Sequence, residues 1–211
     1  MSDASAPAPA DAERPGTRGR PRIGVLALQG AFARHIEMLQ GCGATTVEIR
    51  QPEHLEGIDA VVIPGGESTT MVKLLETFEL AKPLQELIDG GLPLLGTCAG
   101  MILAADRIAD GYPGQLSFGA IDLDVRRNGY GRQVDSFEAD LVVPELGADP
   151  MRAVFIRAPV VERAGPEVDV LATVEGHPVL CRQGRVLVTS FHPELTADDR
   201  LHRLFIGMVP T

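Results

Sequence analysis

Apolar residues in the first half of the chain form short, nearly continuous runs. They cover residues 23–28, 60–63 and 92–95, and residues 45–49 add a fourth segment that is rich in β-branched side chains. Such runs are typical of parallel strands that are covered on both faces. The first half of the chain therefore predicts a parallel sheet.

Between these runs, apolar residues recur at the spacing of an amphipathic helix. Phe32, Ile36 and Leu39 predict one helix, residues 71–78 a second, and residues 99 to about 106 a third. Strands that alternate with helices make a doubly wound α/β pattern, because each crossover helix packs back onto the sheet.

From residue 121 onward the pattern changes to shorter strands. Residues 121–125 and 136–141 alternate polar and apolar positions, residues 151–156 and 186–191 predict two further strands, and residues 201–208 predict a closing helix. Alternation is typical of antiparallel strands with one face in water. We predict an α/β fold with an open, mostly parallel central sheet, helices on both faces and an antiparallel extension.

Composition indicates the domain organisation. Of the 211 residues, 45% are hydrophobic and 23% are charged, as expected of a globular chain. Residues 1–21 are rich in Ala, Pro, Ser and Gly and offer little to bury. We predict a disordered tail over residues 1–21 and one domain over residues 22–211.

Net charge and cysteine content narrow the choice of partner and compartment. The formal net charge of −10 repels phosphate backbones and anionic lipids, which argues against nucleic acid and membrane partners. No apolar stretch is long enough to span a bilayer. Three cysteines without a pairing pattern argue against a disulfide framework and favour the cytoplasm.

Cys98 lies at a predicted strand-to-helix turn. Gly96 and Gly100 flank it at two residues on either side, where a Cβ would collide with neighbouring backbone. The helix start behind Cys98 favours a thiolate, and the N–H of Ala99 can face the oxyanion of an attacked carbonyl. The alternative for this motif alone is a buried structural cysteine.

Gly65 and Gly66 follow another predicted strand. Consecutive glycines at the carboxyl end of a parallel strand let backbone N–H groups approach a ligand, although Gly-Gly-Glu-Ser-Thr is also an ordinary turn and helix N-cap. Glu67 puts an anion in this loop, which suits an ammonium-bearing ligand better than a phosphate.

His192 and Glu194 follow the last predicted strand. Residues two apart in extended chain point the same way, so the carboxylate can orient the imidazole, and Pro193 stiffens the backbone between them. With Cys98 they predict a Cys-His-Glu triad. A zinc site is the competing use of these three residues, but no fourth ligand accompanies them. The remaining histidines are interpreted as ordinary polar residues: His35, His54, His177 and His202.

Arg127 lies in an arginine-rich loop that contains glycines. The loop is either a solvated hairpin tip or a binding element in which Arg127 holds a substrate carboxylate in a bidentate pair. Arg157 also follows a predicted strand end, after Ile156.

Together, the motifs resemble those of a known family. Gly96–Gly100, Pro64–Ser68 and Phe191–Glu194 are similar to the motifs of class I, triad-type glutamine amidotransferases, which have a flavodoxin-like α/β fold. More closely, four segments resemble the glutaminase subunits of pyridoxal 5'-phosphate synthases: Leu28–Ala31, Gly66–Met71, Gly131–Glu138 and Phe155–Pro159. The resemblance covers residues 22–209 and leaves the tail outside.

The resemblance implies hydrolysis of L-glutamine to L-glutamate and ammonia. The ammonia would pass to a separate (β/α)8-barrel synthase subunit that makes pyridoxal 5'-phosphate (vitamin B6), and no metal or cofactor is expected in this chain. The resemblance also assigns residues: the triad Cys98, His192 and Glu194, the oxyanion hole Gly66 and Ala99, the glutamine site Gly66, Glu67, Ser68, Arg127, Ile156 and Arg157, and Gln29 near the oxyanion loop and partner interface.

Three alternatives remain at this point. The chain could serve a different ammonia acceptor, be a non-catalytic binding module with the same fold, or be a stand-alone cysteine hydrolase of γ-glutamyl peptides. The intact triad residues argue against the binding module. High turnover without any partner would favour the stand-alone hydrolase.

Overall fold

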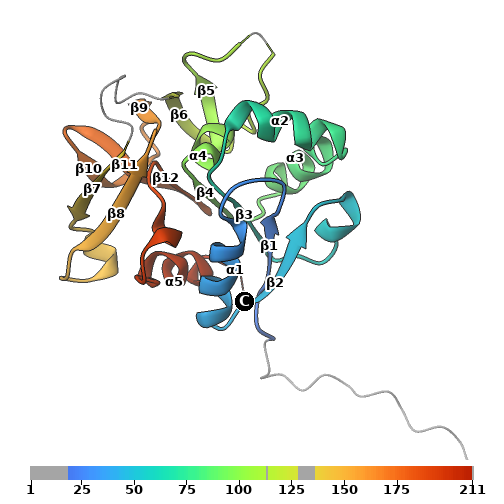
Figure 1. Cartoon of the computed structure of the whole chain (residues 1–211), viewed down its shortest axis with the longest axis horizontal. Helices are drawn as coiled ribbons and strands as arrows, with labels where there is room; N and C mark the ends of the chain where they lie inside the picture. The colour runs from blue at the N-terminus through green and yellow to red at the C-terminus, as the bar shows by residue number, and fades with distance from the viewer. Residues whose placement is uncertain (1–18, 113, 128–135, 211) are drawn as a thin grey trace, which may run out of the picture.

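The computed structural model describes residues 19–112, 114–127 and 136–210 (Figure 1). Most of the predicted tail and most of the Gly131–Glu138 motif lie outside the described residues. Within the described part of the chain, no helix has both the length and the apolar composition that a membrane crossing needs.

A seven-stranded sheet forms the centre of the structure. Its strands are β1 (Arg22–Leu26), β2 (Thr45–Ile49), β3 (Ala60–Ile63), β4 (Leu94–Thr97), β10 (Asp169–Val174), β11 (His177–Gln183) and β12 (Val186–Thr189). They lie in the order β10-β11-β12-β4-β3-β1-β2. The pairs from β12 to β2 are parallel, and β11 and β10 add an antiparallel edge.

Helices cover both faces of this sheet. The helices are α1 (Phe32–Gly41), α2 (Ser68–Thr77), α3 (Ala81–Asp89), α4 (Ala99–Ala104) and α5 (Arg200–Gly207). Successive β3 side chains point to opposite faces: Val62 packs in one apolar cluster with Leu39 of α1 and Phe205 of α5, whereas Val61 packs in another with residues of α2, α3 and α4. Both faces are therefore buried, which accounts for the uninterrupted apolar runs in the parallel strands.

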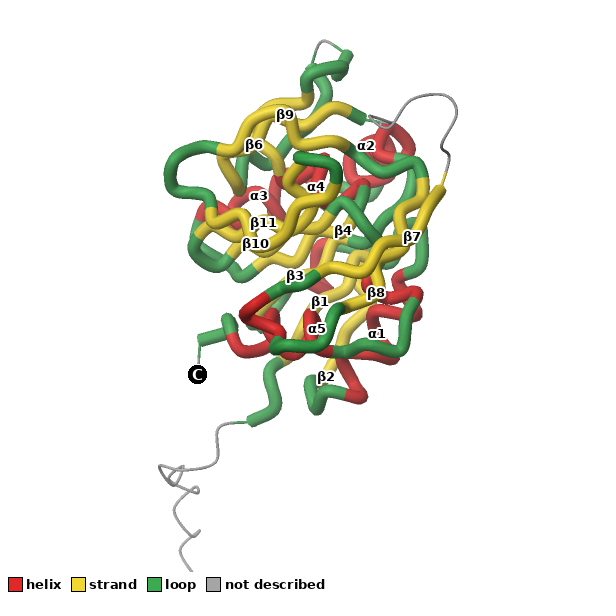
Figure 2. Tube along the Cα trace, turned by 90° about the vertical axis from the view of Figure 1, so that its left-hand side faces the viewer, coloured by secondary structure: helices red, strands yellow, loops and turns green. Residues whose placement is uncertain are grey.

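Two smaller sheets stand apart from the central one. The first contains β5 (Ala105–Ile108), β6 (Ile121–Arg126) and β9 (Val160–Ala164), and the second contains β7 (Ser136–Leu141) and β8 (Met151–Ile156). Figure 2 shows β6 and β9 at the top and β7 and β8 at the right. The mostly parallel central sheet and its antiparallel extension are confirmed, and the second half of the chain is only partly antiparallel, because β6 and β12 also form parallel pairs.

The helix predicted from residue 99 to about 106 is wrong at its carboxyl end. It stops at Ala104, and β5 begins at the next residue. The backbone N–H of Phe118 donates to the carbonyl of Leu103 at 2.7 Å, that of Gly119 to Ala105 at 3.3 Å, and that of Ala120 to Ala104 at 2.8 Å. These long-range hydrogen bonds replace the helical ones, so the chain leaves the helix and pairs with β6.

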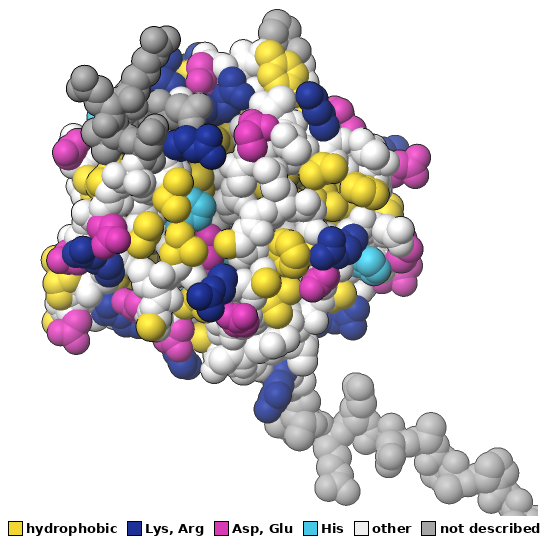
Figure 3. All heavy atoms as spheres, in the orientation of Figure 1, with side chains coloured by type: hydrophobic (Ala, Val, Ile, Leu, Met, Phe, Trp, Pro, Cys, Tyr) yellow, Lys and Arg dark blue, Asp and Glu magenta, His cyan; other side chains and the backbone are white. Residues whose placement is uncertain are grey.

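Charges are mixed on the outside of the molecule. Basic and acidic side chains are interspersed over the face shown in Figure 3. Ion pairs of the surface include Arg152–Glu138 at 2.7 Å and Arg203–Asp199 at 2.6 Å.

Candidate active site

Three neighbouring parallel strands bring the candidate residues to one edge of the central sheet. β12 leads to His192, β4 leads to Cys98, and β3 leads to the loop that contains Gly65 and Gly66. The three strands lie side by side in the order β12-β4-β3, so their carboxyl ends meet. This edge is where open α/β sheets bind ligands.

Cys98 occupies a sharp turn between β4 and α4. Its φ is 51° and its ψ is −105°, a conformation that few non-glycine residues adopt. A Cβ on Gly96 would lie 2.7 Å from the carbonyl oxygen of Gly100, and a Cβ on Gly100 would lie 2.0 Å from that of Ile63. The prediction that both flanking glycines are needed for close backbone approach is confirmed.

His192 and Glu194 form a hydrogen-bonded pair. Nδ1 of His192 lies 2.8 Å from Oε1 of Glu194, whose side chain is buried in the short 3₁₀ segment Pro193–Leu195. Burial acts to raise the pKa of Glu194, but the hydrogen bond from His192 and the electrostatic effects of His35 and His192 together outweigh it, and the pKa is lowered. The carboxylate is therefore ionised and fixes Nδ1 of the imidazole as a donor.

Cys98 and His192 face each other across Gly65. A Cβ on Gly65 would lie 2.4 Å from Cε1 of His192 and 3.3 Å from Cβ of Cys98, so the absence of a side chain makes room for both. Burial acts to lower the pKa of His192, but hydrogen bonds to Cys98 and Glu194 raise it above its usual range. The raised pKa keeps a proton on the imidazole beside the sulfur.

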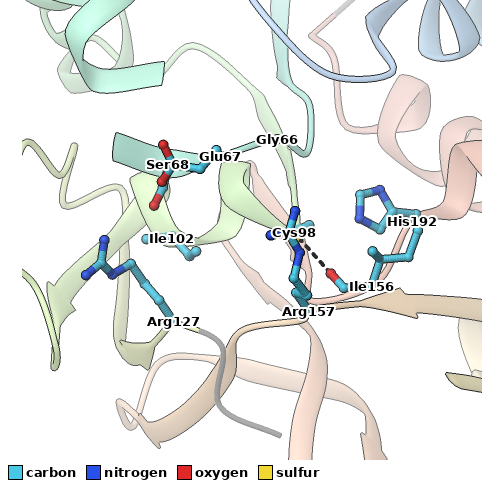
Figure 4. Close-up of a pocket in the computed structure, with 9 residues that line it drawn as sticks. All are labelled: Gly66, Glu67, Ser68, Cys98, Ile102, Arg127, Ile156, Arg157 and His192. Atoms are coloured by element: carbon cyan, nitrogen blue, oxygen red, sulfur yellow. Dashed lines mark hydrogen bonds between the residues drawn. The ribbon is translucent and has the colours of Figure 1, made fainter. Parts of the chain in front are cut away.

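Strand β8 contacts both of these residues through its backbone. The Cys98 thiol donates to the carbonyl oxygen of Ile156 at 3.9 Å, drawn as a dashed line in Figure 4. The backbone N–H of His192 donates to the carbonyl of Val154 at 2.8 Å. The second small sheet thus holds the two candidate catalytic residues against the central sheet.

A cavity of about 190 Å³ opens beside Cys98. This volume is below the roughly 300–1,000 Å³ of pockets that hold drug-sized molecules, so the cavity suits a smaller ligand. In Figure 4, His192 lies on one side of Cys98, and Glu67, Ser68 and Arg127 lie on the other. The complete lining is Gly66, Glu67, Ser68, Cys98, Ile102, Arg127, Ile156, Arg157 and His192.

The lining contains every residue predicted for the glutamine site, together with Cys98 and His192. Among the other predicted residues, Glu194 lies behind His192, and Ala99 is the first residue of α4, where backbone N–H groups have no helical acceptor. Their individual roles stay predictions.

Arg127 is held at the cavity by two neighbours. Its guanidinium donates to the hydroxyl of Thr69 at 3.2 Å and to the backbone carbonyl of Asp110 at 3.0 Å. The Asp110 carboxylate also lies 3.6 Å from Nε. These contacts orient the half-buried guanidinium, which is a preorganised site for a carboxylate.

Glu67 caps helix α2. Its carboxylate accepts from the backbone N–H groups of Thr69 at 2.9 Å and Thr70 at 2.7 Å, and from the hydroxyl of Thr70 at 2.7 Å. Burial acts to raise the pKa of Glu67, but these hydrogen bonds lower it to about 2. The loop is therefore a turn followed by a helix N-cap, as the sequence allowed, and Glu67 is the capping residue. Glu67 also lines the cavity.

Gln29 and Gly30 support the same loop from the end of β1. In the amide orientation that satisfies both neighbours, Gln29 donates to the carbonyl of Glu67 at 3.1 Å and accepts from its N–H at 3.2 Å. A Cβ on Gly30, whose φ is 80°, would lie 1.8 Å from the carbonyl oxygen of Gly65. Gln29 thus lies beside the loop that contains Gly66 and Glu67, while its predicted part in the oxyanion loop and the partner interface stays a prediction.

Three residues near the site were not predicted. Ile102 lines the cavity one helical turn after Cys98, at the i+4 spacing that could have indicated it. His35 and His202, interpreted as ordinary polar residues, are both completely buried behind Glu194. Each lies on the apolar face of its helix, and that position was the available signal.

Nothing among the described residues resembles a metal centre: no three His, Cys, Asp or Glu side chains are grouped to hold an ion.

Comparison with known proteins identifies the family. Residues 25–211 match the SNO glutamine amidotransferase family. The chain is 56% identical over 197 residues to the pyridoxal 5'-phosphate synthase subunit PdxT of Rhodococcus jostii (strain RHA1), with 90% of this chain and 98% of the relative covered. The PdxT of Mycobacteroides abscessus is 56% identical over 190 residues, with 90% and 97% covered.

A solved structure shows the same fold. A crystal structure of a glutamine amidotransferase superposes with a TM-score of 0.82 at 49% identity, covering 89% of this chain and 98% of that chain. The predicted fold class is confirmed, and so is the family inferred from the motifs: this chain belongs to the SNO glutamine amidotransferase family.

Proposed function

We propose that this chain is the glutaminase subunit of a pyridoxal 5'-phosphate synthase. It hydrolyses L-glutamine to L-glutamate and ammonia, and it passes the ammonia to a separate (β/α)8-barrel synthase subunit. One observation carries the proposal: a chain of this family places Cys98 and the His192–Glu194 pair at one small cavity, at the ends of adjacent strands.

The proposed reaction uses Cys98 as the nucleophile. Its thiolate attacks the side-chain carbonyl carbon of glutamine, and the N–H groups of Gly66 and Ala99 stabilise the resulting oxyanion, each donor contributing roughly 3 kcal/mol. His192 then gives its proton to the departing nitrogen, and ammonia leaves a γ-glutamyl thioester on Cys98. A water molecule gives a proton to His192 and cleaves the thioester, which releases glutamate.

The far end of the cavity is suited to the other end of glutamine. Arg127 offers a guanidinium to the α-carboxylate, and Glu67 and Ser68 offer oxygen atoms to the α-ammonium. The Glu67 carboxylate can serve both α2 and a ligand, because an ionised carboxylate has about four acceptor positions. Ile102, Ile156 and Arg157 complete the wall.

The partner and compartment belong to the same proposal. The relatives are named as subunits of pyridoxal 5'-phosphate synthase, which supports a complex with a synthase subunit. All three cysteines are free, in keeping with the cytoplasm. Residues 22–211 would form the glutaminase domain, and residues 1–21 remain a predicted tail.

Replacement of Cys98 tests the function. Cys98→Ala should abolish glutamate release while the far-UV circular dichroism and the binding to the synthase subunit stay unchanged, because a methyl group cannot form the thioester. Cys42→Ala is the matched control, since it removes a thiol outside the cavity lining. Mass spectrometry of the wild type with glutamine should detect the γ-glutamyl adduct on Cys98. Glutamate release by Cys98→Ala would refute the proposal.

The partner is tested by measuring glutamate release with and without the synthase subunit of the same organism. Strong stimulation is expected. High turnover by the chain alone, unchanged by the synthase, would favour a stand-alone hydrolase instead.

A further inference from the structure

Two buried histidines lie behind the candidate triad, on the side away from the cavity. Nε2 of His35 lies 3.3 Å from Oε2 of Glu194, the carboxylate oxygen that His192 does not bind. Nδ1 of His35 lies 3.0 Å from Nε2 of His202. His35 comes from α1 and His202 from α5, and neither side chain is accessible to solvent.

Both histidines are neutral at physiological pH. Burial lowers the pKa of His35 to about 4, with Glu194 acting in the opposite direction and His192 in the same one. Burial also lowers the pKa of His202 to about 3, and His35 adds to this effect, whereas Glu194 and Asp199 oppose it. Each ring therefore carries a single N–H, and its position decides what the ring offers to Glu194.

The contacts select one arrangement of these two protons. If His35 carried its proton on Nδ1, its Nε2 lone pair would face a carboxylate, and His202 would bury an N–H at Nδ1, an atom that has no hydrogen-bond partner. With the proton on Nε2, His35 donates to the hydroxyl of Thr97 at 3.3 Å and accepts from His202 at Nδ1. The same Nε2–H then lies 3.3 Å from Oε2 of Glu194, close enough for a favourable electrostatic contact. Nδ1 of His202 is then a buried acceptor without a donor among the described residues. This costs less free energy than the alternative, in which the Glu194 carboxylate would face the lone pair on Nε2 of His35.

We propose that His35 is a positioning residue of the glutaminase site: its Nε2–H, held by Thr97, stabilises the second carboxylate oxygen of Glu194 electrostatically, and His202 fixes the tautomer of His35. Glu194 then has a histidine at each oxygen: His192 in a hydrogen bond at Oε1, and His35 in an electrostatic contact at Oε2. This inference rests on the proposed triad and adds two residues to it that never touch the substrate.

The contacts from His202 to His35 and from His35 to Glu194 affect catalysis through the orientation of the His192 imidazole. Oε2 of Glu194 is buried and accepts no hydrogen bond from the described residues, so the Nε2–H dipole of His35 at 3.3 Å is the favourable contact that it has from this side. Without His35, that oxygen would lose this contact, and the carboxylate would rotate or take up a proton. His192 would then lose the partner that fixes its tautomer and that stabilises its protonated form. Substrate contacts would not change, because neither histidine belongs to the cavity lining.

The variants His35→Leu and His35→Gln separate the hydrogen bond from the ring. We expect His35→Leu to lower kcat roughly 10- to 100-fold, the range seen when outer partners of functional histidines are removed, with KM for glutamine within about twofold. The Gln side chain can donate to Glu194 from the place of Nε2, so His35→Gln should recover most of the activity. His54→Gln, at a histidine whose Nδ1 accepts from the N–H of Arg50, is the matched control and should match the wild type.

The rate of Cys98 alkylation by iodoacetamide as a function of pH gives a second readout. It should shift in His35→Leu and stay unchanged in His54→Gln, because only His35 acts on the Glu194–His192 pair. A change in stability alone would not move this profile.

Nitrogen-15 NMR of the imidazoles tests the arrangement in the wild type without any variant. The inference requires a protonated Nε2 and a bare Nδ1 on both His35 and His202. A protonated Nδ1 on His35, or a folded His35→Leu with wild-type kcat, would overturn it. A wild type that releases no glutamate even with the synthase would instead refute the proposed function, and the NMR result would still decide the tautomers.

Discussion

The two buried histidines should make the protein sensitive to mild acid. When the chain unfolds, His35 and His202 regain an ordinary pKa near 6.5, whereas in the folded protein the values are about 4 and about 3. Between these limits the unfolded state binds more protons than the folded state, so the free energy of unfolding falls as the pH falls. For each histidine the loss between pH 7 and pH 5 is about 2 kcal/mol.

His192 acts in the opposite direction over this range. Its pKa is raised in the folded state, so the stability that it contributes is present below pH 6.5 and is lost only as the pH rises through the folded value. This opposes the loss by up to about 1 kcal/mol, which leaves a net loss of about 3 kcal/mol between pH 7 and pH 5. That is a large fraction of a typical stability of about 5–15 kcal/mol.

Urea unfolding at pH 7 and pH 5 measures this difference. Far-UV circular dichroism is the suitable signal, because the chain contains no tryptophan. His35→Gln should reduce the pH-dependent loss by about 2 kcal/mol, whereas His54→Gln should leave it unchanged. Glu67 stays ionised over this range in the folded protein, because its pKa is about 2 there, so it adds little to the difference. Equal stability at the two pH values, or an identical loss in wild type and His35→Gln, would refute the reasoning.

Two further predictions concern the cavity. Gly65→Ala places a methyl group 2.4 Å from Cε1 of His192, so we expect a loss of kcat of about 100-fold or more in a folded protein, since a misplacement of about 1 Å can cost that much. Wild-type kcat in this variant would show that the two residues do not need to meet across Gly65. Arg127→Gln should raise KM for glutamine about 10- to 100-fold with a smaller change in kcat, because it removes a bidentate partner of the α-carboxylate. Steady-state kinetics distinguish the effects of the two variants. An unchanged KM in Arg127→Gln would show that Arg127 does not bind glutamine.

The sequence predicted well those features that depend on neighbouring residues. The bounds of β2 and β3 follow from short β-branched and apolar runs, and the strained turn at Cys98 follows from its two flanking glycines. The early end of α4 could not be predicted in this way, because the groups that terminate it come from residues 118–120. Local pattern is informative where the competing interactions are also local.

The candidate site shows the same limit. The His192–Glu194 pair is two residues apart and could be inferred from extended geometry, whereas His35 and His202 are 167 residues apart and meet only in the folded chain. On an apolar helix face, a histidine without a visible partner looks like any other core residue. What distinguishes His35 is its contact with His202, and this contact exists only because α1 and α5 pack on one face of the sheet.

The residues around Cys98 fall into two groups that differ in how freely they can change. Behind the cavity, backbone is in direct contact with backbone or with His192, so any side chain at Gly30, Gly65 or Gly100 would displace the reacting groups. Around the cavity, the lining includes the side chains of Ile102, Arg127 and Ile156. Efforts to alter which amide this scaffold accepts therefore have the lining side chains to redesign, while the glycines keep the reacting groups in place.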